Sequence, residues 1–321
     1  MSGENENKEM ALAEEESPSE PPAEEGCAVK ETLNEECELA KKFRPKYFFE
    51  AVISLVGNYL YVRSLRVFFY VWAVVEYFNN DKVGSIVGRY QRLWACYGPK
   101  IANYWTIVYY IIGFAIFGTL FYHCVVKNQP KIKLRSIIGA KSVTAVVTIG
   151  IAMHLITLVT TSSFSLLLPE CLESYRNSVK SSIQLLLPVV VVIEDVILAP
   201  LFEEIYWRGL FFGLLEKSGI KPLWIILLSG ILFGVWHGNP VQGVFAAIGG
   251  CLLSFLRYKY RSVKVTIIVH SIANLLSFIV DLRINLVEYY VLLFFLVPFL
   301  VLIAVFTVCV DDNAYTAPKK I

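Results

Sequence analysis

Apolar residues gather in long uninterrupted runs along most of this chain. Runs of membrane-spanning type lie near residues 103–126, 143–168, 183–213, 241–256, 263–281 and 286–310, most of them long enough to cross a bilayer, and a shorter run covers 222–236. A hydrocarbon core about 30 Å thick needs about 20 helical residues, and unbroken apolar runs favour helices over a closed barrel. The pattern therefore predicts an all-α, polytopic membrane helical bundle.

The region 47–78 is harder to assign, because Arg63 and Arg66 interrupt its apolar pattern. It is either one long tilted helix or a span followed by a helix in the membrane interface. With this region included, we expect about eight transmembrane helices. The expected parts are a disordered acidic tail (1–44), an N-terminal transmembrane region (45–180), a core (181–282), a C-terminal transmembrane helix (283–310) and a short polar tail (311–321).

Composition supports a membrane protein. Of the 321 residues 56% are hydrophobic and only 17% are charged, whereas soluble domains are nearer a quarter charged. Residues 1–40 hold 13 Glu and two Lys, so the rest of the chain carries 27 − 13 = 14 acidic and 29 − 2 = 27 basic residues. We expect the tail to be disordered, since it has almost nothing to bury. The basic excess forms no stripe, which argues against a nucleic-acid partner.

Loop charges predict an orientation. The loops 127–141 and 257–264 are rich in Lys and Arg, which places both on the cytoplasmic side. At 1.5 Å per residue, His270 would then lie about 9 Å and His237 about 24 Å from that surface. Straight helices would keep the two histidines apart, so the 222–237 segment is tilted or re-entrant, or this orientation is wrong.

Three ionisable residues stand out inside the 183–213 run. Glu203, Glu204 and Arg208 lie among apolar and aromatic neighbours, although a charge inside a span costs about 2.5–3.5 kcal/mol even on lenient scales. Glu204 and Arg208 are four residues apart, so they share a helix face and can pair. Glu203 lies about 100° around the helix. A simple ion pair between helices would explain the first two residues and leave Glu203 unpaired.

Two further polar groups lie in apolar segments. His237 ends the 222–237 segment, and His270 precedes Asn274 by one helical turn. The other two histidines, His123 and His154, have no polar company, and we expect them to be ordinary structural residues.

These groups have a shared chemistry. A carboxylate and a histidine can hold and deprotonate a water, as peptide hydrolysis requires. A second histidine and an asparagine can donate hydrogen bonds to the oxyanion that develops. Glu203, His237 and His270 could instead ligate zinc, although the HExxH spacing typical of a zinc protease is absent.

The three groups resemble the signature motifs of the CPBP family, which comprises type II CAAX prenyl endopeptidases and bacteriocin-processing or self-immunity (Abi) membrane proteins. The resemblance covers about 185–280 and is closest in character to the Abi branch. The matching residues are Glu203-Glu204-xxx-Arg208, Phe233-xxx-His237 and His270-xxx-Asn274.

The resemblance implies an intramembrane glutamic endopeptidase that needs no metal. Glu203 would be the catalytic base and His237 its partner in activating water, while His270 and Asn274 would form the oxyanion hole. Glu204 and Arg208 would hold the site together, and Phe233 would pack beside it.

The resemblance also implies the partners, namely membrane lipid and a peptide or membrane-protein substrate, prenylated at a CaaX terminus or not. The protein would be integral to the cell membrane, or to an internal membrane such as the endoplasmic reticulum in a eukaryote. Two other interpretations remain open: a non-catalytic Abi-like binding, immunity or scaffold protein that keeps the fold, and a transporter, which lacks support from paired broken helices.

One acidic pair does not belong to the family pattern. Glu194 and Asp195 lie on the same apolar run as the first motif. We expect either that they border a water-filled cavity or that the helix begins later than residue 183.

Overall fold

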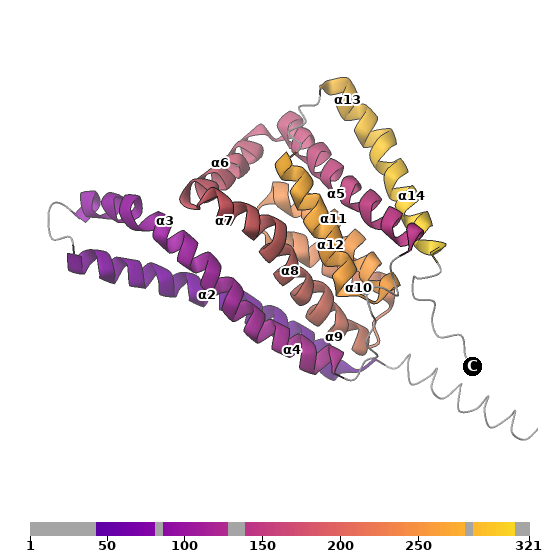
Figure 1. Cartoon of the computed structure of the whole chain (residues 1–321), viewed down its shortest axis with the longest axis horizontal. Helices are drawn as coiled ribbons and strands as arrows, with labels where there is room; N and C mark the ends of the chain where they lie inside the picture. The colour runs from indigo at the N-terminus through magenta and orange to yellow at the C-terminus, as the bar shows by residue number, and fades with distance from the viewer. Residues whose placement is uncertain (1–42, 81–85, 128–138, 280–284, 312–321) are drawn as a thin grey trace, which may run out of the picture. The chain divides into compact units, whose positions relative to one another are not determined.

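The computed structural model describes residues 43–80, 86–127, 139–279 and 285–311, and every regular element in these ranges is a helix (Figure 1). The all-α prediction is confirmed. The predicted acidic tail lies outside the described residues except for its last two positions. The elements are α2 (Pro45–Asn80), α3 (Ile86–Gly113), η1 (Phe114–Gly118), α4 (Thr119–Phe121), η2 (Tyr122–Val126), α5 (Ala140–Leu167), α6 (Pro169–Leu185), α7 (Pro188–Ile193), η4 (Glu194–Leu198), α8 (Ala199–Glu204), η5 (Ile205–Phe211), α9 (Phe212–Lys217), α10 (Pro222–Trp236), α11 (Pro240–Tyr260), α12 (Val263–Ile279), α13 (Leu286–Val291), η6 (Leu292–Leu296) and α14 (Val297–Cys309), where η marks a π-helical turn.

The ambiguous N-terminal region is a single helix, α2, of 36 residues that runs beside α3. Its two arginines do not break it, because aromatic rings cover both guanidinium groups. Arg63 lies 5.2 Å from the ring centre of Tyr59, and Arg66 lies 5.8 Å from that of Trp105 on α3. Cation–π contacts of this kind are favourable where water is scarce.

The structure supports fewer full spans than the eight expected. Within the described residues, four helices are long and apolar enough to cross a membrane, namely Ala102–Val126, Ala140–Leu167, Pro240–Tyr260 and Leu286–Cys309. A bent pair of helices would make a fifth. Helices α10 and α12 have 15 and 17 residues, or about 23 and 26 Å at 1.5 Å per residue. Both fall short of a 30 Å hydrocarbon core, and eight spans are therefore not confirmed.

The run 183–213 is not one helix. Leu186 and Leu187 are extended, and the helical segments Pro169–Leu185 and Pro188–Lys217 meet at 118°. Proline at position 188 favours a helix start, because its fixed φ suits the first turn and its missing N–H would have no partner there. The helix that carries the acidic pair thus begins later than the apolar run, as one of our two alternatives stated.

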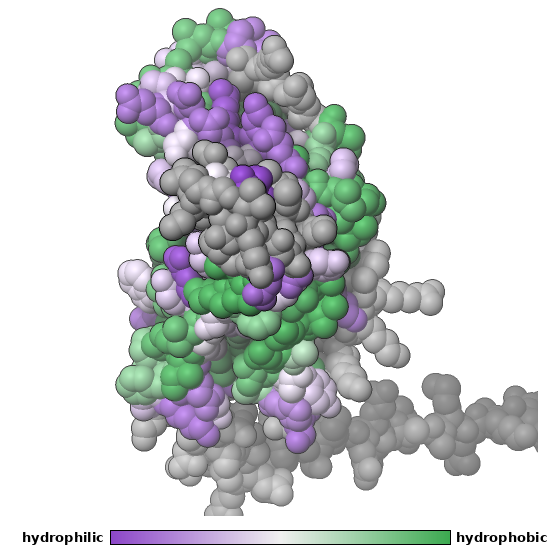
Figure 2. Space-filling view, turned by 90° about the vertical axis from the view of Figure 1, so that its left-hand side faces the viewer, coloured by the Kyte–Doolittle hydropathy of each residue, from purple (hydrophilic) through white to green (hydrophobic). Residues whose placement is uncertain are grey.

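The outer surface matches a lipid environment. Helix α14 and the turn before it leave Phe294, Phe295, Leu302 and Phe306 more than 60% exposed. Figure 2 shows broad hydrophobic areas on one face, with hydrophilic residues gathered toward its upper and lower parts. With its long apolar helices, the chain is an integral, multi-pass membrane protein.

Helices α10 and α11 form the tightest pair of the fold, and glycine makes their approach possible. A Cβ on Gly230 would lie 2.6 Å from the backbone nitrogen of Cys251, and one on Gly234 would lie 2.4 Å from the carbonyl oxygen of Gly243. Small residues four apart allow such close packing of membrane helices. The chain turns between the two helices at Gly238, whose φ of 66° favours glycine. This turn fixes the position of His237.

Candidate active site

The two glutamates lie at the end of α8, between the π-helical turns η4 and η5. Such turns are rare in proteins and frequent at functional sites. Glu204 and Arg208 are fully buried, and Nη1 of Arg208 donates to Oε1 of Glu204 over 2.9 Å. The pair forms as its spacing predicts.

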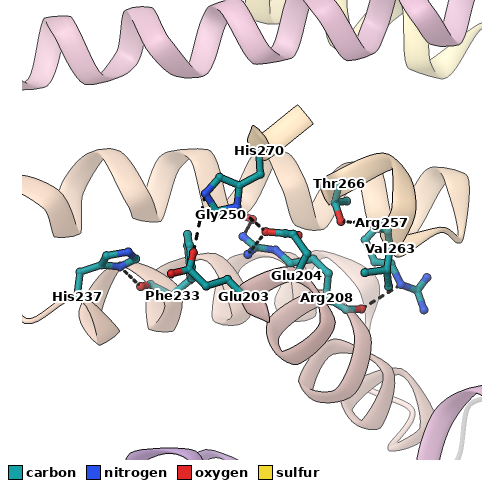
Figure 3. Close-up of polar contacts among 10 residues, drawn as sticks. All are labelled: Glu203, Glu204, Arg208, Phe233, His237, Gly250, Arg257, Val263, Thr266 and His270. Carbon is teal, nitrogen blue, oxygen red and sulfur yellow. Dashed lines mark hydrogen bonds and ion pairs between the residues drawn. The ribbon is translucent and has the colours of Figure 1, made fainter. Parts of the chain in front are cut away.

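Arg208 is held on several sides, as Figure 3 shows. Its Nη2 donates to the carbonyl oxygen of Gly250 on α11 over 3.0 Å, and its guanidinium lies 4.4 Å from the ring centre of Phe233. Its own carbonyl oxygen accepts a hydrogen bond from Nε of Arg257, also over 3.0 Å. Arg208 therefore joins its own helix to α10 and α11.

His270 connects the two glutamates. Its Nδ1 lies 3.0 Å from Oε1 of Glu204, and its Nε2 lies 3.8 Å from Oε2 of Glu203 (Figure 3). The first distance is a hydrogen bond and the second is too long for one.

His237 and Asn274 are each anchored by a backbone carbonyl group. Nδ1 of His237 lies 2.8 Å from the carbonyl oxygen of Phe233, and Nδ2 of Asn274 donates to that of Asp195 over 2.7 Å. A carbonyl oxygen only accepts, so Nδ1 of His237 carries the proton and, in the neutral ring, Nε2 is a free acceptor.

One cavity of about 150 Å³ brings these groups together, and Glu203, His237, His270 and Asn274 all line it. Phe233 lies between the histidines, 4.9 Å from the ring centre of His237 and 6.0 Å from that of His270. Straight helices would have kept the two histidines apart, so either the 222–237 segment is tilted or re-entrant or the predicted orientation is wrong, as stated above. Glu204 and Arg208 lie behind the cavity and do not line it.

Sequence reasoning missed several residues around this cavity. Its lining includes the polar side chains of Thr157, Gln242 and Ser277. Ser277 bonds through Oγ to Nδ1 of His154 over 3.1 Å, so His154 is one residue removed from the cavity. The signal that could have identified Ser277 is its position, one turn beyond Asn274 on the same helix face of α12.

The zinc alternative, with Glu203, His237 and His270 as ligands, stays a prediction. Within the described ranges, no three His, Cys, Asp or Glu side chains are grouped so that they could hold a metal ion. We derive no step through a metal.

Comparison with protein families gives a match at this region. Residues 185–276 match the family described as type II CAAX prenyl endopeptidase Rce1-like. The match covers 92 of the 321 residues. Searches of curated proteins and of solved structures gave no match.

The Rce1-like region begins just before α7 and ends inside α12, so it contains every residue of the three motifs. The family is one of proteases, and the chain that carries the matched region is a multi-pass membrane protein. The match does not separate prenylated from unprenylated substrates.

Proposed function

We propose that the chain is an intramembrane endopeptidase in which Glu203 and His237 activate a water for attack on a peptide bond. The observation that carries this proposal is the convergence of four polar side chains from α8, α12 and the end of α10 on one cavity. A purely structural role would explain Glu204 and Arg208, which pair with each other outside the cavity lining. It would not explain why four other polar side chains line one cavity.

The protonation state of His237 supports the water-activating role. With its Nδ1 proton donated to the carbonyl of Phe233, the neutral ring offers Nε2 as an acceptor. Glu203 offers a carboxylate in the same cavity, with 22% of its side chain exposed. A water between two acceptors donates both of its protons and turns its lone pairs toward the substrate carbonyl. Glu203 takes one proton as the general base.

Asn274 and His270 supply the donors for the oxyanion. One N–H of the Asn274 amide donates to the carbonyl oxygen of Asp195, and the second N–H is available to donate to a ligand. His270 donates Nδ1–H to Glu204, so it must carry a second proton on Nε2 to donate to the oxyanion. Glu204, fixed by Arg208, acts as the positioning residue that orients this imidazole, as the carboxylate does in a Ser–His–Asp triad.

A separate groove, lined mainly by residues of α2 and α3, favours a lipid-modified substrate. It has a volume of about 420 Å³ and an apolar lining that includes Val67, Phe69 and Leu185. An isoprenyl or acyl chain suits such a lining, because every methylene buried contributes about 0.8 kcal/mol.

The experiment compares peptide termini in membranes that carry the wild type or Glu203→Gln, which keeps the shape of the side chain and removes its charge. We expect termini that vanish in Glu203→Gln and in His237→Gln, with turnover reduced at least a hundredfold, in line with the loss of a general base. His123→Gln replaces an exposed histidine outside the site and serves as the matched control. Equal termini in folded wild type and Glu203→Gln would refute the proposal and favour a non-catalytic binding protein.

A further inference from the structure

A larger chamber adjoins the catalytic cavity. It has a volume of about 570 Å³ and is lined by residues of α3, α6, η4 and α12. Seven residues line both spaces, Asp195, His237 and Asn274 among them. The volume lies within the range of about 300–1,000 Å³ that ligand sites occupy. If a peptide reached the catalytic cavity through this chamber, side chains next to the cleaved bond would lie in the chamber.

Two carboxyl groups line the chamber without a lysine or arginine side chain beside them in the described ranges. Glu194 and Asp195 both line it, and no Lys or Arg occurs among the described lining residues. Neither carboxylate pairs with a Lys or Arg anywhere in the described ranges. Hydroxyl groups of Thr106 and Tyr110 hydrogen-bond to Glu194, which orients that side chain without neutralising it.

Asp195 is tied directly to the catalytic residues. Its carbonyl oxygen accepts the amide hydrogen bond of Asn274, and its carboxylate is near enough to that of Glu203 for the two charges to repel. Carboxylates are expensive inside a membrane span unless a cation or water meets them. A cation that entered the chamber with the substrate would relieve this repulsion and gain the attraction of Glu194 and Asp195.

We propose that Glu194 and Asp195 determine the specificity of the enzyme, by binding a lysine or arginine side chain of the substrate that lies close to the cleaved bond. This inference rests on the proposed function. It names the substrate as a peptide with a basic residue near the cleavage site, and it assigns the chamber to that residue.

The test uses the purified full-length protein in lipid nanodiscs and a peptide library read by mass spectrometry. Once a cleaved peptide is found, two fluorogenic versions are compared that carry arginine or citrulline at each position in turn. Citrulline keeps the shape of arginine and lacks its charge. We expect at least a tenfold higher kcat/KM for arginine at one position, equivalent to about 1.4 kcal/mol. The ratio should fall toward one in Glu194→Gln and Asp195→Asn.

The ratio is independent of how much total activity each variant keeps, so partial misfolding does not imitate the result. Glu173→Gln removes an exposed carboxylate of α6 that does not line the chamber, and it should keep the wild-type ratio. A wild type that cleaves peptides with no preference for a cation, or variants that keep the preference, would overturn this inference alone. A wild type that cleaves no peptide more than Glu203→Gln does would overturn the proposed function as well.

Discussion

The buried pair of Glu204 and Arg208 allows a quantitative test of how the site is held. The two charges lie 2.9 Å apart and neither side chain is exposed. At an effective dielectric constant of 20, their Coulomb attraction is about 6 kcal/mol, and the loss of hydration opposes it. Removal of one partner of such a pair typically costs about 3–5 kcal/mol, because the other charge stays buried without compensation.

We therefore expect Arg208→Met to lower the free energy of unfolding by about 3–5 kcal/mol. This change leaves the carboxylate of Glu204 with only His270, and it leaves the carbonyl of Gly250 without its donor. The double variant Glu204→Gln/Arg208→Met contains no buried charge at this position. It should regain most of the lost stability, to within about 2 kcal/mol of the wild type.

Activity should not follow stability in the double variant. The amide introduced by Glu204→Gln still accepts a hydrogen bond from His270, but it lacks the negative charge that stabilises an imidazolium. Turnover should stay at least tenfold below the wild type even though the fold is restored. Unfolding is measured by titration with SDS in mixed micelles, followed by tryptophan fluorescence, and turnover with the peptide found above.

Two outcomes would refute this reasoning. A cost below about 1 kcal/mol for Arg208→Met would show that the pair does not hold the helices together. A double variant that is as unstable as the two single changes added together would show that the residues act independently, since coupled neighbours deviate from additivity.

Two more changes test how α10 and α11 place His237. Gly234→Ala would put a Cβ 2.4 Å from the backbone oxygen of Gly243, so the free energy of unfolding should fall by about 1–3 kcal/mol and turnover should fall with it. Gly57→Ala is the control, because a Cβ at Gly57 would have no atom within 4 Å and should not destabilise the protein. Asn239→Ala removes the side chain that caps α11 and should lower the free energy of unfolding by about 1 kcal/mol. Asn239→Asp should keep the cap. Equal melting temperatures for the two variants would argue against a stabilising role of this cap.

The sequence was sufficient for the all-α fold and for singling out Glu203, His237, His270 and Asn274, which line one cavity, because buried charges and histidines in apolar runs are rare enough to be informative. It did not single out Thr157, Gln242 and Ser277, which line the same cavity. It was not sufficient for the number of spans. Leu186 and Leu187 look like the middle of an apolar span, and only the following proline marks the bend. Gly230 and Gly250 reveal their role only when two helices are seen in contact.

The proximity of His237 to His270 was also beyond a one-dimensional argument. Depth counted along straight helices assumes that each helix starts at the membrane surface and runs along the normal. In the structure α10 is short and packs through glycines against α11, and its end meets α12 through Phe233. Long-range packing of this kind depends on shape complementarity between helices, which hydropathy does not record.

The charges within this fold divide into two groups, and the division bears on function. Glu216 pairs with Arg257 and Arg261, and Glu204 pairs with Arg208, so these carboxylates are neutralised inside the scaffold. Within residues 185–276, which the structure describes throughout, the carboxylates without an Arg or Lys partner are Glu203, Glu194 and Asp195. All three line a cavity. A carboxylate kept in a membrane span at a cost of about 2.5–3.5 kcal/mol is stabilised when water or a cation lies beside it. For Glu203 we propose the attacking water in this role, and for Glu194 and Asp195 the basic side chain of the substrate.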